Sequence, residues 1–197
     1  MDQVEHHGMT DPLILIKVQL HRGLSQEEAK DNLEPLKAAM VEYAMANKPP
    51  PTKASGLVLL PGVTELLERL QAASRVHNLK VGLVTGNLEP IAWSKMEALG
   101  IRHLFSEPSF GGFGSDYCSH NIENGAADRA ELVRIAARRA AATASGFEVV
   151  ARFHIGDAPN DVLAGCPSWP RLCSYTSIPV RAFLWTQSRV EGAPSVS

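Results

Sequence analysis

The sequence predicts an α/β fold, in which a parallel sheet with helices on both faces follows a small helical unit. From residue 56 onward, short apolar runs alternate with longer segments of helical spacing, a pattern typical of strands joined by crossover helices. Residues 8–47 show helical spacing alone. Between the two parts lies Lys48-Pro49-Pro50-Pro51, where a helix must stop and the chain is stiff.

Composition limits the classes of partner. The chain has 197 residues, 45% of them apolar, and is long enough for one buried core. A net charge of −2 without a sustained Lys/Arg block argues against nucleic acid or an anionic membrane surface as partner. No apolar run reaches bilayer length and Met1–Glu5 do not resemble a signal peptide, so we expect a cytoplasmic protein. Three cysteines without a Cys-x-x-Cys pair predict free thiols.

Two helices are expected in the first part. Thr10 can cap the first, with Pro12 in its opening turn where a missing N–H is harmless, and Gly23 ends it. Ser25 and Glu28 form a capping box at the start of the second. The apolar positions that recur at helical spacing are Leu13, Ile16 and Leu20 on one face of the first helix and Ala29, Leu33, Leu36, Met40 and Tyr43 along the second.

Helices and strands should alternate in the second part. A helix is expected after Pro61-Gly62, and the glycine-rich segment 110–116 is expected to be a loop. The inner side of that helix should carry Val63, Leu66, Leu67 and Leu70. The other expected elements are a strand at 80–84, a helix at 88–99, a helix at 128–144 and a strand at 149–155.

The last part of the chain gives a weaker pattern. Residues 166–170 contain two prolines and break any helix that starts at Asn160, whereas Ala182–Trp185 form a possible strand. The expected organisation is a disordered start at 1–7, a helical cap at 8–51, an α/β core at 52–165 and a poorly defined tail at 166–197.

Two aspartates four residues apart follow the last expected strand of the core. Gly156 frees the backbone at the end of that strand, and Asp157 and Asp161 occupy the turn and helix start beyond it. Mg²⁺ prefers carboxylate oxygens and usually takes one or two protein carboxylates plus a substrate phosphate. The pair therefore indicates a Mg²⁺ site. The alternative is that both residues make only turn and cap hydrogen bonds.

A second candidate group follows the strand expected at 80–84. Ligands of open α/β sheets bind at the carboxyl ends of the strands. The Thr85 hydroxyl and the N–H groups of Gly86 and Asn87 are suited to phosphate oxygens, although the same residues also suit a plain strand-to-helix turn. Arg129 is the candidate cation that would balance the phosphate charge, and its alternative is a position facing water.

Taken together, these segments resemble the second, third and fourth motifs of the haloacid dehalogenase-like (HAD) hydrolase superfamily, in its phosphoglycolate phosphatase-like branch. The resemblance covers about residues 8–165. It implies a Rossmann-like core with a helical cap, and an Mg²⁺-dependent phosphatase that acts on a small phosphate monoester through an aspartyl-phosphate. The similar segments are Leu83–Asn87, Gly111–Asp116 with Arg129–Leu132, Gly156–Asp161 and, in the cap, Gly8–Leu13.

The resemblance also implies a role for each candidate residue. Asp157 would ligate Mg²⁺ directly, and Asp161 would ligate it or hold its water. Thr85 would bind a phosphoryl oxygen, while Arg129 would neutralise phosphate charge and orient the nucleophile.

In such a protein the cap would select the leaving group of a small phosphorylated molecule. Thr10 and Asp11 are the candidate specificity residues. Their alternative role is helix capping.

The resemblance is incomplete at the first motif of the superfamily. That motif, an Asp-x-Asp at the end of the first strand, carries the nucleophile and the general acid/base. No two aspartates here are separated by one residue. The seven aspartates are Asp2, Asp11, Asp31, Asp116, Asp128, Asp157 and Asp161.

The missing motif has a structural consequence as well. In the superfamily, the first strand lies between the two strands that end here at Thr85 and Asp157, so we expect these strands to lack their shared neighbour, as in a truncated hydrolase. The alternative is that residues 13–18 form a strand that fills the gap.

We therefore predict a chain that retains ligands for phosphate and Mg²⁺ but is inactive or nearly so. The alternatives are a non-catalytic phosphate- and Mg²⁺-binding or regulatory protein, and a fragment without independent function.

Overall fold

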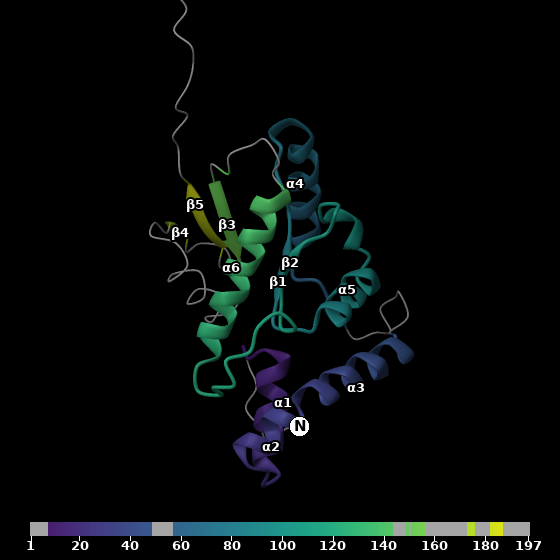
Figure 1. Cartoon of the computed structure of the whole chain (residues 1–197). Coiled ribbons are helices and arrows are strands. Elements are labelled where there is room, and N and C mark those ends of the chain that lie inside the picture. The colour runs from purple at the N-terminus through teal and green to yellow at the C-terminus, as the bar shows by residue number, and fades with distance from the viewer. Residues whose placement is uncertain are drawn as a thin grey trace, which may run out of the picture.

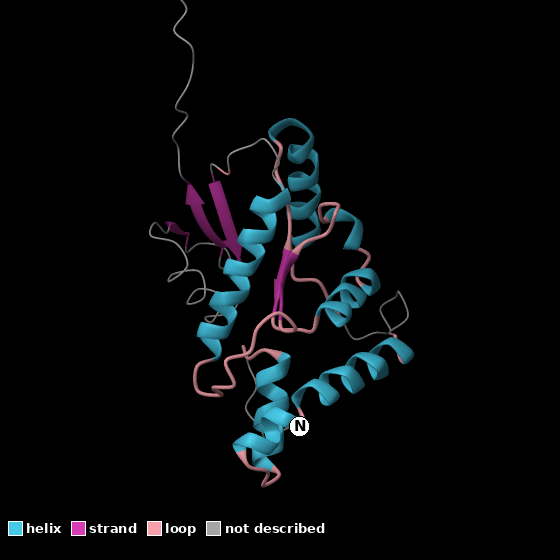
Figure 2. Cartoon of the chain, viewed as in Figure 1, coloured by secondary structure: helices cyan, strands magenta, loops and turns pink. Residues whose placement is uncertain are grey.

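The computed structural model describes residues 8–48, 57–143, 149 and 151–156, together with the backbone of two strands, Cys173–Tyr175 and Ala182–Thr186. The described part is a mixed α/β structure, in which three helices at one end adjoin a core of strands and helices (Figures 1 and 2). The predicted fold class is therefore confirmed. None of the described helices is long and apolar enough to cross a membrane.

The helical unit contains one helix more than predicted. Its helices are α1 (Asp11–His21), α2 (Gln26–Asp31) and α3 (Leu33–Ala46). The capping box is confirmed, because Glu28 N–H donates to the Ser25 hydroxyl at 3.2 Å and Ser25 N–H donates to the Glu28 carboxylate at 2.8 Å. The prediction that one continuous helix follows α1 was wrong. Asn32 has a ψ of −7°, far from the helical value near −42°, and this separates α2 from α3.

Burial is concentrated at the start of the helical unit. Leu13 and Ile16 of α1 have no exposed surface, as expected. In contrast, Tyr43 of α3 is 72% exposed. Leu66 in the next helix is 37% exposed, so its expected place on the inner side was wrong. Helical spacing identifies an apolar face, but only packing decides how much of that face is covered.

The α/β core follows from residue 63. Its elements are α4 (Val63–His77), β1 (Leu83–Thr85), α5 (Glu89–Ala98), a 3₁₀ turn (Arg102–Leu104), β2 (Gly111–Phe113), α6 (Gly125–Thr143) and β3 (Ala151–Ile155). Apart from β2 and the short 3₁₀ turn, each was expected at nearly these bounds.

The glycine-rich segment contains a strand where a loop was expected. Gly111 and Gly112 belong to β2, and a Cβ on Gly111 would collide with the Leu83 carbonyl oxygen. A Cβ on Gly112 would collide with the carbonyl oxygen of Leu132 in α6. Glycine therefore allows β2 to lie close to both β1 and α6, a tertiary reason that local sequence does not reveal.

The described strands form two sheets. β1 and β2 pair in parallel, with Leu83 opposite Gly111 and Thr85 opposite Phe113. β3 pairs antiparallel with β5 (Ala182–Thr186), which pairs antiparallel with β4 (Cys173–Tyr175). The possible strand at 182–185 is confirmed, and β4 was not expected.

A single parallel sheet is therefore not formed by the described strands, because none of them joins β1 to β3. Residues 13–18 do not fill this gap, since they lie within α1. The alternative that they form a strand was wrong.

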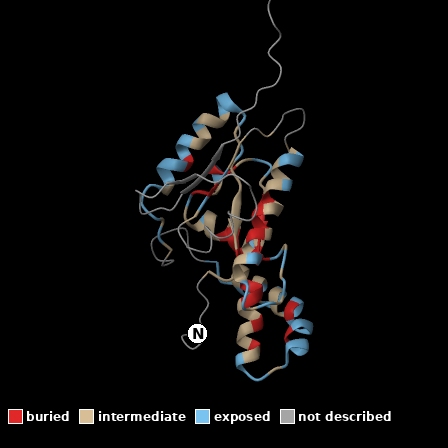
Figure 3. Ribbon diagram, turned by 90° about the vertical axis from the view of Figure 1, so that its left-hand side faces the viewer, coloured by how far each residue is buried: buried red, intermediate tan, exposed pale blue. Residues whose placement is uncertain are grey.

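Helices cover both faces of the β1–β2 pair. α6 packs against both strands, and its buried side chains include Leu132 and Val133. Figure 3 shows the buried stretches of the chain in red. On the other side, Leu83 of β1 and Trp93 of α5 pack against a buried cluster that includes Leu67 of α4. This arrangement carries the carboxyl ends of β1 and β2 toward the helical unit (Figure 1).

Candidate functional site

The turn after β1 contains the predicted phosphate-binding residues. Asn87 N–H donates to the Thr85 hydroxyl oxygen at 3.3 Å, a local bond across a tight turn. This bond uses the oxygen of the Thr85 hydroxyl as an acceptor and leaves its hydrogen to donate to another oxygen. The partly buried Thr85 side chain is therefore chemically suited to a phosphoryl oxygen.

The start of α1 docks directly on this turn. Asp11 N–H donates to the Gly86 carbonyl oxygen at 2.8 Å. The Asp11 carboxylate accepts hydrogen bonds from Asn87 Nδ2 at 3.0 Å and from Leu88 N–H at 2.9 Å. Asp11 is 6% exposed, so these bonds are shielded from water. Both oxygens of its carboxylate thus bind the turn.

Thr10 does not cap α1 with its side chain. Its hydroxyl oxygen is fully buried and has no hydrogen-bond partner among the described residues. An unpartnered buried hydroxyl is unusual because it loses hydration without compensation. Capping, the alternative role weighed for Thr10, therefore does not account for this residue.

Arg129 lies beside the same turn although it belongs to α6. A Cβ on Gly86 would lie 3.4 Å from Arg129 Nη1 and 2.9 Å from Thr10 Cα. Gly86 is thus a point of close approach between three segments of the chain. The structure brings the Thr85–Asn87 turn, Arg129 and the Thr10–Asp11 pair into one place.

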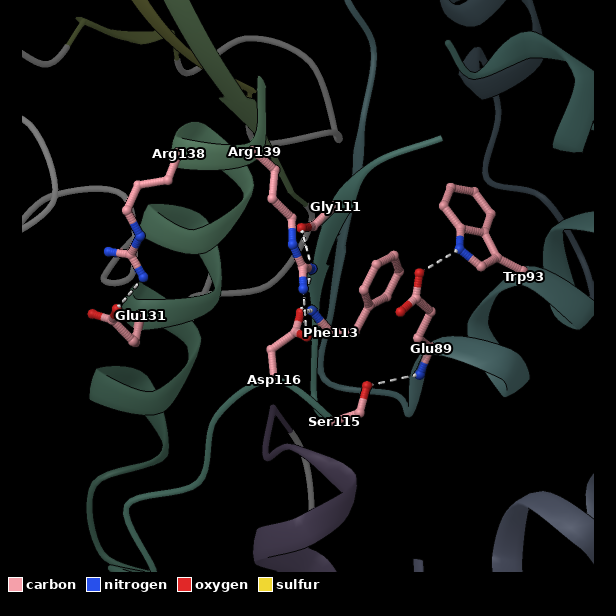
Figure 4. A network of polar contacts seen from close by, with 9 residues as sticks. All are labelled: Glu89, Trp93, Gly111, Phe113, Ser115, Asp116, Glu131, Arg138 and Arg139. Carbon is pink, nitrogen blue, oxygen red and sulfur yellow. Dashed lines mark hydrogen bonds and ion pairs between the residues drawn. The ribbon is translucent and has the colours of Figure 1, made fainter. Parts of the chain in front are cut away.

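A second polar network surrounds the turn after β2 (Figure 4). The Arg139 guanidinium donates to the Asp116 carboxylate at 2.6 and 2.8 Å and to the Gly111 carbonyl oxygen at 2.9 Å. Asp116 also accepts from Phe113 N–H at 2.9 Å. The hydrogen bond that Arg139 donates to the Asp116 carboxylate raises the pKa of Arg139, which keeps the guanidinium charged.

A pair of contacts ties this second turn to α5. Glu89 N–H donates to the Ser115 hydroxyl at 3.2 Å, and Trp93 Nε1 donates to the Glu89 carboxylate at 3.3 Å (Figure 4). Sequence reasoning identified Asp116 only as part of a motif and missed Arg139. A helical arginine gives no local signal for a bond across 23 residues.

A comparison with protein families now identifies the wider group. The family model described as haloacid dehalogenase-like hydrolase matches residues 17–165, which is more than half of the chain. The chain belongs to this family. No curated protein shows a significant match.

The matched span of the HAD-like hydrolase family includes most candidate residues. Thr85, Arg129, Asp157 and Asp161 all fall within residues 17–165, whereas Thr10 and Asp11 precede them. The first two lie near one another in the fold, and the last two lie outside the described residues. The metal pair therefore stays a prediction.

Among the described residues, no group of three or more His, Cys, Asp or Glu side chains could hold a metal ion.

A buried acidic residue, Asp128, directly precedes Arg129 in α6 and has no exposed surface. One of its oxygens accepts from Ser119 N–H at 3.0 Å, and the other has no partner in the part of the chain that the structure describes. Asp128 was not singled out from the sequence, because an acidic residue in a first helical turn looks like an ordinary dipole contact.

Proposed function

We propose that this HAD-like hydrolase derives from an Mg²⁺-dependent phosphatase of the phosphoglycolate phosphatase-like branch, acting on a small phosphate monoester through an aspartyl-phosphate. The chain keeps residues that hold the phosphate. The single observation that supports this proposal is the 3.4 Å approach of Arg129 Nη1 to the Cβ position of Gly86, beside the Thr85 hydroxyl. A hydroxyl donor and a guanidinium at one turn are complementary to a phosphoryl group.

The residues of the turn would act in distinct ways. The Thr85 hydroxyl would donate to one phosphoryl oxygen, and the Gly86 N–H would face the same group. The Asn87 N–H, which donates to the Thr85 hydroxyl oxygen, would hold that hydroxyl in place. The Arg129 guanidinium would neutralise part of its charge. Mg²⁺, if bound by Asp157 and Asp161, would supply the remaining positive charge, and a carboxylate pair is the donor set this ion prefers.

The chemical step itself requires an attacking carboxylate. None of the seven aspartates forms an Asp-x-Asp pair, and loss of the nucleophile in a covalent mechanism costs roughly 10⁶ in rate, by analogy with serine proteases. We therefore expect this chain to hydrolyse an aryl phosphate no faster than buffer with Mg²⁺ present. Turnover that Asp157→Ala abolishes would contradict the proposed loss of activity.

Ligand binding tests the site directly. In titration calorimetry with inorganic phosphate and Mg²⁺, we expect the wild-type chain to bind phosphate and Arg129→Met to bind it about tenfold or more weakly, since hydrogen bonds to charged groups contribute about 1.5–3 kcal/mol. Arg134→Met is the matched control on the same helix, because Arg134 pairs with Glu131 at 3.0 Å. Absence of phosphate binding by the wild-type chain would refute the proposed site.

A non-catalytic phosphate-binding or regulatory protein is the second candidate function. It is favoured by the same two facts, the assembled Thr85–Arg129 turn and the absence of an Asp-x-Asp pair. Tight phosphate binding without turnover would support it.

A further inference from the structure

We infer that Asp11 is a positioning residue, which holds the Thr85–Asn87 turn in its ligand-binding shape before a phosphate arrives. This inference rests on the proposed function of the turn. It assigns Asp11 a task different from selection of a leaving group.

The first step of the argument is the geometry of the Asp11 carboxylate. One oxygen accepts from Asn87 Nδ2 at 3.0 Å, and the other accepts from Leu88 N–H at 2.9 Å. Leu88 is the residue before the first turn of α5, where backbone N–H groups lack intrahelical partners. Asp11 therefore caps a helix 77 residues away in sequence. It fixes both ends of the short segment between β1 and α5.

The second step is the orientation of the Asn87 amide. Its oxygen accepts from Lys95 Nζ at 2.8 Å while its nitrogen donates to Asp11. The ammonium on one side and the carboxylate on the other allow only this orientation of the amide. Each bond also polarises the other. The Asn87 side chain is thus committed to holding the turn, and so is its backbone N–H, which donates to the Thr85 hydroxyl oxygen.

The third step separates positioning from simple electrostatics. A carboxylate beside a phosphate site repels the ligand, so loss of the Asp11 charge alone would tighten phosphate binding. A positioning role predicts the opposite sign, because a loosened turn must be ordered again when the ligand binds. The direction of the change in affinity therefore distinguishes the two roles.

Asp11→Asn is the test variant, and Asp31→Asn, an exposed change of the same charge on α2, is its control. Hydrogen exchange of the Leu88 amide should be about tenfold or more faster in Asp11→Asn than in the wild type, because an amide offers one acceptor where the carboxylate offers two. The Leu132 amide of buried α6 serves as the reference for global unfolding. Asp31→Asn should change neither amide.

A swap of the two side chains gives the rescue. In Asp11→Asn with Asn87→Asp, the new amide can donate to the new carboxylate, accept from Leu88 N–H and leave the second carboxylate oxygen for Lys95. Exchange at Leu88 should return to within about threefold of the wild type. If Asp11→Asn only weakened the fold in general, the second substitution would not restore slow hydrogen exchange at Leu88.

Phosphate titration completes the test. If wild-type protein binds inorganic phosphate, Asp11→Asn should bind it about tenfold more weakly, and equal or tighter binding would overturn the inference. If wild-type protein binds no phosphate, the proposed function fails, whereas the exchange data still decide the role of Asp11. Unchanged exchange at Leu88 in Asp11→Asn, or no recovery in the swapped variant, would refute positioning.

Discussion

The turns after β1 and β2 and the helix pair α2–α3 are stabilised in different ways. Asp11 and Asn87 are 76 residues apart, and Arg139 and Asp116 are 23 apart. In the helix pair, by contrast, the bonds between Ser25 and Glu28 and between Glu34 and Lys37 each span three residues.

Burial follows the same division. At the start of α1, which contacts the β1 turn, the N-cap residue Thr10 and Leu13 of the first turn have no exposed surface. In α3, Leu33 is the one residue that is buried. The difference teaches that the candidate site is held by hydrogen bonds between distant segments. In the outer helices the Ser25–Glu28 and Glu34–Lys37 bonds are local, and Gln26 Nε2 adds a long-range bond to the His120 carbonyl oxygen.

Removal of buried apolar volume should give the largest contrast between the two regions. Leu13→Ala should lower the free energy of unfolding by about 2–5 kcal/mol, because Leu13 is fully buried and a cavity remains. Tyr43→Ala should change it by less than about 0.5 kcal/mol, because Tyr43 is 72% exposed. Urea denaturation measures both. Similar losses in the two variants would abolish the contrast.

Loss of the long-range ion pair should give the next largest effect. Arg139→Met should cost about 1.5–3 kcal/mol of stability, because it removes hydrogen bonds to Asp116 and to the Gly111 carbonyl while retaining much of the side-chain stem. Arg138→Met is the control. Arg138 is 65% exposed and pairs with Glu131, so we expect a change of at most about 1 kcal/mol. Thermal unfolding should rank the two neighbours in this order.

Loss of the buried Thr10 hydroxyl near the β1 turn should raise stability, in contrast to the two preceding substitutions. Thr10→Val should raise the free energy of unfolding by about 1 kcal/mol, because a buried hydroxyl without a partner is replaced by a methyl group of similar shape. Thr85→Val should instead be destabilising by about 1 kcal/mol, since Asn87 N–H loses its acceptor. A loss of stability in Thr10→Val would show that its hydroxyl has a partner in solution.

The smallest expected effect lies in the capping box of α2. Hydrogen bonds from Ser25, the backbone bond above all, lower the pKa of Glu28 from 4.5. A lowered carboxyl pKa stabilises the folded state above the unfolded pKa, and this contribution is lost as pH falls through the folded pKa. Glu28→Gln should therefore flatten the pH dependence of helix content below about pH 4.5. An unchanged profile by circular dichroism would contradict a role for Glu28 ionisation.

The sequence predicted the residues of the site better than their connections. Thr85 and Arg129 were selected from strand ends and charge, and the fold places Arg129 beside the turn that begins at Thr85. The bond between Asp11 and Leu88 could not be predicted, because no spacing rule links residues 77 apart. Arg139 was missed for the same reason.

The elements themselves show the same limit. The Ser25–Glu28 box and the stop at Gly23 were visible in the sequence because caps and turns are set by neighbouring side chains. β2 was expected to be a loop, since its glycines have low strand propensity and gain their strand conformation from β1 and α6.

By itself, the sequence determined the α/β class, most helix bounds, the likeness to HAD-like hydrolases and the absence of an Asp-x-Asp pair. These properties depend on local propensity, spacing and residue identity. The tertiary structure decided that Asp11 binds the β1 turn, that glycines form β2 and that the described strands divide into two sheets. Those outcomes depend on which distant surfaces meet and on the space left between them, and no local pattern encodes either.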